Sequence, residues 1–347
     1  MHFSSLLAKQ GDRTSHILRS RTRITCSSHR ENHIFSKLGC THGNHSEDCL
    51  TKALAPEEFR SSKNRIKSLK LCESCVTIAA TTRKGTGSHL CQLFAVNGSQ
   101  SRDYTDELKE FFTHSVEHPH GWGMAMFYEG GSVSLEKEPE CAVKSRYLKQ
   151  RLSQRIVVSS MMAHIRYATV GGMEYSNTHP FIDRDSTGRC WTQIHNGTIF
   201  DYPELRPYVS QQDGTTDSER ILCYFIDQLN WQSTAFQKPL DSQERFDLLD
   251  SIVCEMARGN KLNLILYDGE LMYVHTNFRD SLYYCQNNGS TLFCTVPLSK
   301  GSWHPVPFTQ LLAYKDGYLL YRGTIHGNEY IPNPEQLKYM YSEFANP

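Results

Sequence analysis

The chain has 347 residues and carries 37 Lys plus Arg against 37 Asp plus Glu, so its formal net charge is zero. A balanced charge argues against a polybasic nucleic-acid binder. No run approaches the roughly 18 consecutive apolar residues of a membrane-spanning helix. Twelve cysteines in a chain of this length are too dilute for a disulfide scaffold. We therefore expect no nucleic-acid partner and no membrane span.

The charge is unevenly distributed. Residues 1–90 contain 15 Lys plus Arg and 7 Asp plus Glu, a net of +8, whereas residues 91–347 contain the remaining 22 and 30, a net of −8. The first segment is rich in Ser, Thr, His and Arg and lacks a sustained apolar period, so it cannot bury enough apolar surface to offset its ordering entropy. We expect residues 1–90 to form a disordered basic leader, residues 91–325 one globular domain, and residues 326–347 a short tail.

Three interpretations of the leader remain open. Its first 30 residues are Arg-rich, Ser-rich and nearly free of acid, which is typical of an organellar transit peptide. It is alternatively a propeptide. The third interpretation is a mis-set start, with translation beginning at Leu90, because an alternative bacterial start codon encodes methionine but is printed as Leu inside a longer reading frame. None of the three requires the leader to have a function.

Five cysteines lie in the leader, and Cys72 and Cys75 form a lone CxxC. Together with the Cys and His residues between Cys40 and Cys49, they suggest zinc ligands, but a second knuckle of matched spacing is missing. We expect no metal and no cofactor. The cysteines after Cys91 mostly lie in apolar runs, which indicates buried, reduced thiols.

After residue 90, short apolar runs, glycine turns and amphipathic segments follow one another. Expected helices are 105–116, 145–152, 216–229 (with Thr216 or Asp217 as N-cap) and 245–258. Expected strands are 91–97, 123–129, 133–135, 156–165, 191–195, 262–267, 271–276, 282–286, 291–295, 311–315 and 318–322. Turns are expected at Gly130-Gly131, Asp268-Gly269, Asn288-Gly289 and Asp316-Gly317. Because strands come in hairpins and helices in pairs, the pattern predicts an α+β fold with antiparallel sheets.

Four short segments combine residue types that carry chemistry. They are Cys91 at the start of a strand, Ala163-His-Ile-Arg-Tyr-Ala-Thr-Val-Gly171, His195-Asn-Gly-Thr198 and Gly214-Thr-Thr-Asp-Ser-Glu219. Taken singly, each has an ordinary explanation. An Arg after a buried strand is usually a surface or ion-pair residue, an Asn-Gly pair is usually a turn, and Thr-Asp-Ser-Glu is usually a helix cap.

In this order and spacing, the four segments resemble the class II glutamine amidotransferases, which are N-terminal-nucleophile hydrolases with cysteine as the first residue. The resemblance covers most of residues 91–325. His118-Pro-His-Gly-Trp-Gly123 and Asn177-Thr-His-Pro-Phe181 are similar to the stand-alone group that contains the glutathione-degradation amidotransferase subunit and the γ-glutamyl hydrolase of ergothioneine synthesis. The resemblance implies a four-layer αββα sandwich with two antiparallel sheets.

The resemblance also implies the reaction groups. Cys91 is the nucleophile, and its own α-amine, with a reference pKa around 7.7–8.0, serves as the base. The side-chain amide of Asn196 and the backbone N–H of Gly197 donate to the oxyanion. His179 and His195 are then structural supports and not members of a catalytic dyad.

A second set of residues is implied to bind the amino-acid head group of the substrate. Arg166 grips the α-carboxylate with its planar fork, which a lysine cannot match. Asp217 pairs with the α-ammonium, and Thr169 lines the same pocket. The segments 118–122 and 175–179 are expected to surround the leaving group.

The implied activity is hydrolysis of the γ-amide of glutamine or of a γ-glutamyl compound through a thioester, in the cytoplasm, with release of glutamate and ammonia or an amine. Any acceptor enzyme or peptidase is expected to be a separate subunit. This activity requires Cys91 to be freed, because the nitrogen of an internal residue is an amide without basicity. If Cys91 is not freed, the alternative is a non-catalytic, partner-binding protein of the same fold.

Overall fold

The computed structural model describes residues 91–168 and 171–336. The expected leader, with its cysteines, the end of the expected tail from residue 337, and Thr169 therefore lie outside the described residues. One sheet has seven strands in the order β13-β11-β12-β1-β6-β3-β4, and every neighbouring pair is antiparallel. Its strands are β1 (Gln92–Gly98), β3 (Trp122–Phe127), β4 (Val133–Glu138), β6 (Ser160–Ile165), β11 (Tyr283–Asn287), β12 (Ser290–Cys294) and β13 (His304–Pro305).

A second antiparallel sheet has six strands in the order β15-β14-β10-β9-β8-β7. Its strands are β7 (Phe181–Arg184), β8 (Cys190–Thr198), β9 (Lys261–Tyr267), β10 (Met272–His275), β14 (Leu312–Lys315) and β15 (Tyr318–Arg322). A small separate ladder pairs β2 (Arg102–Asp103) with β5 (Val157–Val158). The four glycine turns predicted from the sequence each connect an antiparallel hairpin, namely β3–β4, β9–β10, β11–β12 and β14–β15.

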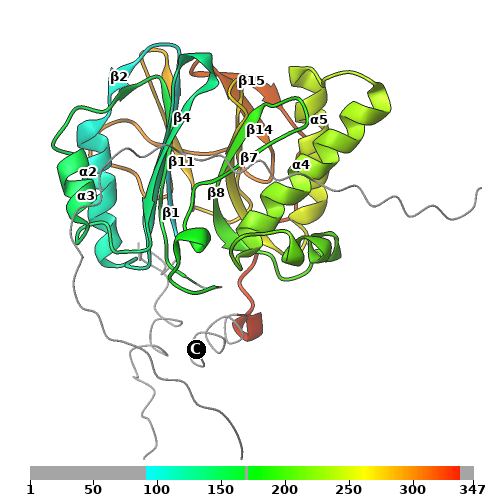
Figure 1. The fold of residues 1–347 in the computed structure, drawn as a ribbon, viewed down its shortest axis with the longest axis horizontal. Coiled ribbons are helices and arrows are strands. Elements are labelled where there is room, and N and C mark those ends of the chain that lie inside the picture. Colours follow the sequence, from blue (N-terminus) through cyan, green and yellow to red (C-terminus); the bar gives the residue numbers. More distant parts are fainter. Residues whose placement is uncertain (1–90, 169–170, 337–347) are drawn as a thin grey trace, which may run out of the picture. The chain divides into compact units, whose positions relative to one another are not determined.

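Helices cover the outer face of each sheet (Figure 1). The first sheet carries α2 (Thr105–Thr113) and α3 (Arg146–Arg151), and the second carries α4 (Asp217–Phe236) and α5 (Ser242–Met256). Short 3-10 turns span His114–Val116 (η1), Glu129–Gly131 (η2), Tyr175–Asn177 (η3) and Pro203–Ser210 (η4). The order helix, sheet, sheet, helix is the four-layer αββα sandwich, so the expected fold is confirmed.

Three apolar cores correspond to the three interfaces between the four layers. Phe94 and Phe111 belong to the core under α2 and α3, whereas Phe225 belongs to the core under α4 and α5. The core between the sheets contains Leu93 of β1 and Ile194 of β8. Because β1 is buried on both faces, residues 93–96 at its centre form a continuous apolar run and not an alternating pattern.

Several local expectations are confirmed in detail. The helix α4 is capped by Thr216, whose side chain accepts from the Glu219 amide at 3.3 Å. The Asn288-Gly289 turn has positive φ at both residues, as a two-residue hairpin with the twist of the strands requires. The cysteines after Cys91 are free, although Cys190, Cys223 and Cys254 are only half-buried.

Two expectations were wrong. The single strand expected over 156–165 is two strands, because β5 leaves the main sheet to pair with β2 before β6 begins. The strand expected over 191–195 continues to Thr198, so Asn196 and Gly197 form ladder pairs with β9 and not a turn. The second difference matters for the site, because a strand holds its side chains more firmly than a turn does.

Candidate active site

Cys91 lies immediately before β1, in the middle of the first sheet. Its Sγ accepts a hydrogen bond from the Tyr167 amide at 3.3 Å and donates to the Tyr167 carbonyl at 3.2 Å. Burial raises the pKa of the Cys91 thiol, although the Tyr167 backbone and the positive charge of Arg166 oppose this. At neutral pH the thiol is therefore protonated, and it needs a base before it can act as a nucleophile.

The second sheet contributes Asn196 and Gly197, near the end of β8. They pair with Asn263 and Leu262 of β9. Leu93, two residues after Cys91, and Ile194, two residues before Asn196, both belong to the core between the sheets. Leu93 pairs with His164 of β6, whose Nε2 donates to the His195 carbonyl at 3.2 Å, so the end of β8 that carries Asn196 lies beside the start of β1, next to Cys91.

Gly197 is required by the close approach of the neighbouring strand. A Cβ at this position would lie 1.9 Å from the Lys261 carbonyl oxygen and 2.3 Å from His195 Nε2. Any side chain here would push β8 away from β9 and would misplace the Gly197 amide. The glycine is therefore fixed by packing, whatever its chemical role.

Arg166 follows β6 directly and is only 2% exposed. Its Nη1 donates to the Gly172 carbonyl at 2.8 Å and its Nη2 donates to the Gly171 carbonyl at 3.0 Å. Burial lowers the pKa of Arg166, whereas the neighbouring Cys91 and Asp217 raise it. The guanidinium of Arg166 thus holds the loop that follows β6, while its positive charge acts on the Cys91 thiol.

Asn177 ties that loop to the segment before α4. Its Nδ2 donates to the Gly172 carbonyl at 3.2 Å, and its Oδ1 accepts from the Thr215 amide at 2.7 Å. A Cβ on Gly214 would lie 2.4 Å from Asn177 Oδ1, so this glycine is also required by a close approach. The connection places the N-terminus of α4, and with it Asp217, beside the loop after Arg166.

Asp217 is the first residue of α4 and is buried. Its Oδ2 accepts from the Ile199 amide at 2.8 Å, which ties α4 to the segment that follows β8. The Ser218 hydroxyl donates to Asp217 Oδ1 at 3.3 Å and lies 2.9 Å from His195 Nδ1. Asp217 raises the pKa of the Cys91 thiol, so the structure brings these two predicted site residues within electrostatic reach of each other.

The buried histidines His164 and His179 are neutral. Burial lowers the pKa of His164 to about 3 and that of His179 well below its usual range. The two rings lie 4.1 Å apart, and His164 Nε2 donates to the His195 carbonyl at 3.2 Å. His164 thus contacts the strand that carries Asn196, whereas neither ring nitrogen of His179 has a hydrogen-bond partner among the described residues. The structural role expected for His179 and His195 stays a prediction.

The segment expected at the leaving group lies against Tyr167. The His120 and Tyr167 ring centroids are 5.0 Å apart, and the Ala168 amide donates to His120 Nδ1 at 2.9 Å. His118 Nε2 lies 3.1 Å from Gln92 Nε2. These contacts bring 118–122 next to the residue whose backbone holds the Cys91 thiol.

One residue of the site was missed by the sequence analysis. Lys261, the first residue of β9, is 4% exposed, and its Nζ donates to Asn196 Oδ1 at 3.1 Å. Burial lowers its pKa to about 7, and the Cys91 thiolate would raise it. The available signal is that a lysine directly precedes the apolar run 262–267. The expected strand begins at residue 262 and therefore leaves Lys261 outside.

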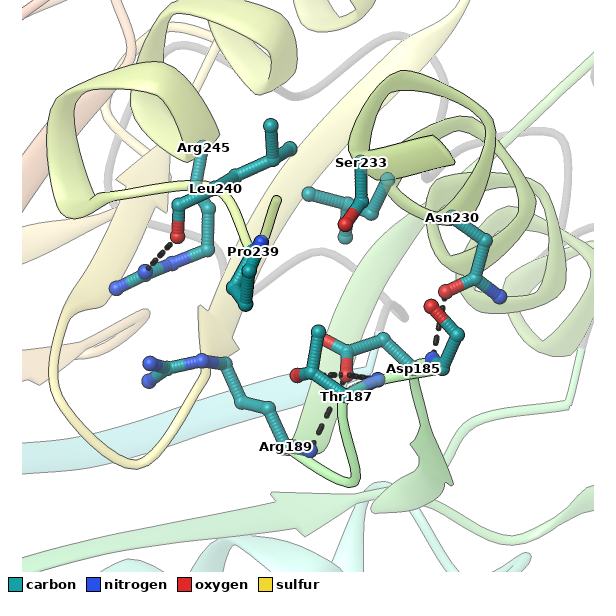
Figure 2. A pocket seen from close by; sticks show the side chains of 10 residues that line it. Asp185, Thr187, Arg189, Asn230, Ser233, Pro239, Leu240 and Arg245 are labelled. Carbon is teal, nitrogen blue, oxygen red and sulfur yellow. Dashed lines mark hydrogen bonds between the residues drawn. The ribbon is translucent and has the colours of Figure 1, made fainter. Parts of the chain in front are cut away.

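Two cavities lie at the other end of the strands. Figure 2 shows the smaller one, of about 30 Å³, where Asp185, Arg189 and Arg245 approach one another. It holds about one water molecule. A wider hollow of about 410 Å³ is lined by Phe127 and Tyr267, which end β3 and β9 far from Trp122 and Lys261. Neither cavity includes a residue of the candidate site.

Over 91–168 and 171–336, no group of three or more His, Cys, Asp or Glu side chains is placed to hold a metal ion. Within the same ranges, none of the helices combines the length and the apolar character that crossing a bilayer requires.

The family model of the class-II glutamine amidotransferases matches residues 90–290. A presumed glutamine amidotransferase of Haemophilus influenzae is 31% identical over 189 residues, which are 54% of this chain and 63% of that protein. A second, from Escherichia coli, is 33% identical over 162 residues, 46% of this chain and 62% of that protein. The chain thus spans somewhat less than two thirds of either relative.

Among solved structures, the glutamine phosphoribosylpyrophosphate amidotransferase of Bacillus subtilis superposes with a TM-score of 0.50 at 15% identity, over 68% of this chain and 49% of that one. At this identity the likeness concerns the fold alone. The family match covers well over half of the chain and includes Cys91, Arg166, Asn196 and Asp217. The chain therefore belongs to the class-II glutamine amidotransferases, the family whose shared chemistry is hydrolysis of the glutamine amide.

Proposed function

We propose that Cys91 hydrolyses the γ-amide of free glutamine or of a γ-glutamyl compound. The α-amine of Cys91 accepts the thiol proton, and Sγ forms a bond to the γ-carbonyl carbon. The C–N bond then breaks, and the protonated amine gives its proton to the departing ammonia or amine. Water attacks the resulting thioester with the same amine as base, which releases glutamate and restores the thiol. The observation that carries this proposal is a protonated thiol that shares its site with Arg166, Asp217 and Asn196.

The electrostatics of the site explain why the amine is the base. Because burial raises the pKa of the Cys91 thiol, the thiol does not ionise unaided at neutral pH. His164 and His179 are buried and neutral. Neither is a hydrogen-bond partner of Cys91 Sγ, which bonds to the Tyr167 backbone. A free α-amine with a pKa near 7.7–8.0 is on the same residue and has the right basicity.

The negative charge of the tetrahedral intermediate needs donors that are already in place. We assign these to Asn196 Nδ2 and the Gly197 amide. Their position in β8, paired with β9, supports the assignment, because a strand holds both groups without reorganisation during the reaction. The close packing at Gly197 holds its amide in the same way.

We further propose that Arg166, Thr169 and Asp217 bind the head group of the substrate. A guanidinium suits an α-carboxylate, and a carboxylate at the first position of α4 suits an α-ammonium. The opposite charges of Arg166 and Asp217 act on one thiol, which supports a zwitterionic substrate held beside Cys91. This arrangement selects free glutamyl head groups and excludes glutamine inside a peptide chain.

The mechanism needs an active chain that begins at Cys91. We propose that residues 1–90 are absent from it, and that residues 91–325 form the amidotransferase domain. In support, the family match begins at residue 90, one residue before the nucleophile. We also propose that the enzyme acts in the cytoplasm as a hydrolase on its own or with a separate acceptor or peptidase subunit.

The test is release of glutamate and ammonia from L-glutamine by protein whose N-terminus is shown by intact mass to be Cys91. γ-Glutamyl-cysteinyl peptides are assayed in parallel to define the leaving group. Cys91→Ala is expected to lose all activity. Cys190→Ala, a half-buried cysteine at the far end of the sandwich, serves as the matched control and is expected to keep it. Equal rates in Cys91→Ala and the unmodified enzyme refute the assigned nucleophile.

A further inference from the structure

Lys261 is a buried lysine that has no acidic partner among the described residues. None of the ion pairs within residues 91–168 and 171–336 includes it. Its Nζ instead lies 3.1 Å from Asn196 Oδ1 and 4.9 Å from the centre of the Phe278 ring. A buried charge without a carboxylate is costly. A chain that keeps such a charge next to its nucleophile has a chemical use for it.

The contact with Asn196 fixes which way the carboxamide points. An ammonium group is a donor only, so it must face the amide oxygen and not the amide nitrogen. Asn196 Nδ2 then points away from Lys261 and is the end of the side chain that remains to meet an oxyanion. The position of Nζ is itself restricted, because Phe278 lies under it and contacts Tyr330, with ring centroids 5.9 Å apart.

The charge of Lys261 acts on the thiol as well. It lowers the pKa of Cys91, and a Cys91 thiolate favours the charged form of Lys261 in return. In the resting site the thiol is neutral, so the ammonium is uncompensated. When negative charge develops on the sulfur and then on the substrate oxygen, the ammonium gains its partner. Interactions that strengthen only along the reaction coordinate raise kcat and not merely substrate affinity.

We propose that Lys261 is a positioning residue of the amidase site, which orients the Asn196 carboxamide toward the oxyanion and favours ionisation of Cys91. The proposal rests on the function proposed above. Arg166, after β6, and Asp217, on α4, also act on the thiol, with opposite signs. They stay in place when Lys261 alone is changed, so the effect of Lys261 is separable from theirs.

The first test is a double-mutant cycle with glutamine as substrate. Lys261→Met, which keeps the apolar stem, is expected to lower kcat by ~10–100-fold, with KM changed less than about threefold, because it removes part of an oxyanion-site interaction. Because Lys261 acts in part through Asn196, Lys261→Met is expected to lower kcat less in the Asn196→Ala background than in the native enzyme, and the loss that remains there reports its effect on Cys91 ionisation. An unchanged kcat in Lys261→Met, or losses that multiply in the double variant, overturns the proposal.

The second test does not depend on turnover. The rate of Cys91 alkylation by iodoacetamide is followed against pH by peptide mass spectrometry, with Lys315→Met as a matched lysine variant at the far end of the sandwich. Because Lys261 is charged below about pH 7, the alkylation rate at about pH 6 is expected to fall in Lys261→Met and to stay unchanged in Lys315→Met. An unchanged rate in Lys261→Met overturns the proposal. If no variant or native enzyme hydrolyses glutamine, the proposed function fails, while this measurement still decides the role of Lys261.

Discussion

Two buried basic residues, Arg245 and Lys261, lie at opposite ends of the strands and differ in how their charges are compensated. Arg245 of α5 donates to Asp268 at 2.8 Å, to Glu270 at 2.7 Å and to the Leu240 carbonyl at 2.9 Å. Burial lowers the pKa of Arg245, but the charge of Asp268 and other nearby groups raises it by more, so the net shift is upward. Lys261 has one amide oxygen as acceptor, and burial lowers its pKa to about 7.

The difference distinguishes a cluster of charges that stabilises the fold from a group of charges that serves the reaction. At the far end, Asp268 also accepts from the Leu271 amide and from the Tyr273 hydroxyl, so donors and acceptors there satisfy one another. At the Cys91 end, the charged groups act on a neutral thiol and are balanced only when the reaction places negative charge among them.

The largest effect on stability is expected at the far end. Arg245→Met removes the nearer of the two cations beside the fully buried Asp268 carboxylate and leaves only Arg189, at 3.9 Å, which should cost up to about 3–5 kcal/mol of unfolding free energy. Turnover per folded molecule should not change, because Arg245 is remote from Cys91. Urea unfolding and glutamine hydrolysis measure the two quantities. A cost below about 1 kcal/mol would show that this cluster is not structural.

The largest effect on turnover, among variants that keep the nucleophile, is expected at Asn196. Asn196→Ala removes an oxyanion donor and should lower kcat by ~10²–10³-fold, while KM for glutamine stays nearly constant. Steady-state kinetics of the processed enzyme measure both constants. A loss confined to KM would instead place Asn196 in ground-state binding.

Gly197 should be sensitive to a single added carbon. Gly197→Ala places Cβ against the Lys261 carbonyl and should destabilise the fold by about 1–3 kcal/mol or more, as overpacking does. Gly172→Ala is the matched control, because there a Cβ meets nothing closer than a Glu174 oxygen at 3.6 Å. Thermal unfolding compares the two. Equal stability of both variants would contradict the strand pairing at Gly197.

The smallest effect is the pH dependence of the unfolding free energy, which should differ between the Lys261 and Arg245 variants. The pKa of Lys261 is about 7 when folded and near 10.4 when unfolded, so the unfolded chain binds more protons between these values. The destabilisation by Lys261 is therefore complete below pH 7 and is lost as pH rises toward 10. Lys261→Met should be more stable than the native chain at pH 7, and its advantage should shrink by at most about 1.4 kcal/mol per pH unit above that.

Arg245 supplies the control for this pH series. Its guanidinium stays protonated in both states, so the effect of Arg245→Met should show no such dependence between pH 7 and 9. Urea unfolding at several pH values measures both series. A pH-independent difference for Lys261→Met would show that Lys261 titrates normally in the folded chain.

Much of the fold could be predicted from local chemistry. Asn288-Gly289 and the amphipathic face of α2 are short-range signals, and they predicted a hairpin and a covered sheet face correctly. The four-layer arrangement came from the resemblance to a family and not from these signals. The break between β5 and β6 could not be predicted, because it depends on pairing with β2, some 55 residues earlier in the chain.

The site shows the same limit. Cys91, Arg166 and Asp217 could be named only through the resemblance to a family, since each motif taken singly has an ordinary explanation, and the structure brings their charges within reach of one another. Asn196-Gly197 resembled a turn because the Asn-Gly pair usually forms one, whereas pairing with β9 holds it in a strand. Lys261 carried no local signal of function, since its role depends on a contact with a residue 65 positions away.

The central claim is that the unblocked α-amine of Cys91 is the base. It is tested most directly by comparing protein that begins at Cys91 with protein that keeps one uncleavable residue at position 90, both confirmed by intact mass. We expect the first to release ammonia from glutamine and the second to be inactive although folded. Equal rates in the two proteins would contradict the account, because an amide nitrogen on Cys91 cannot accept the thiol proton.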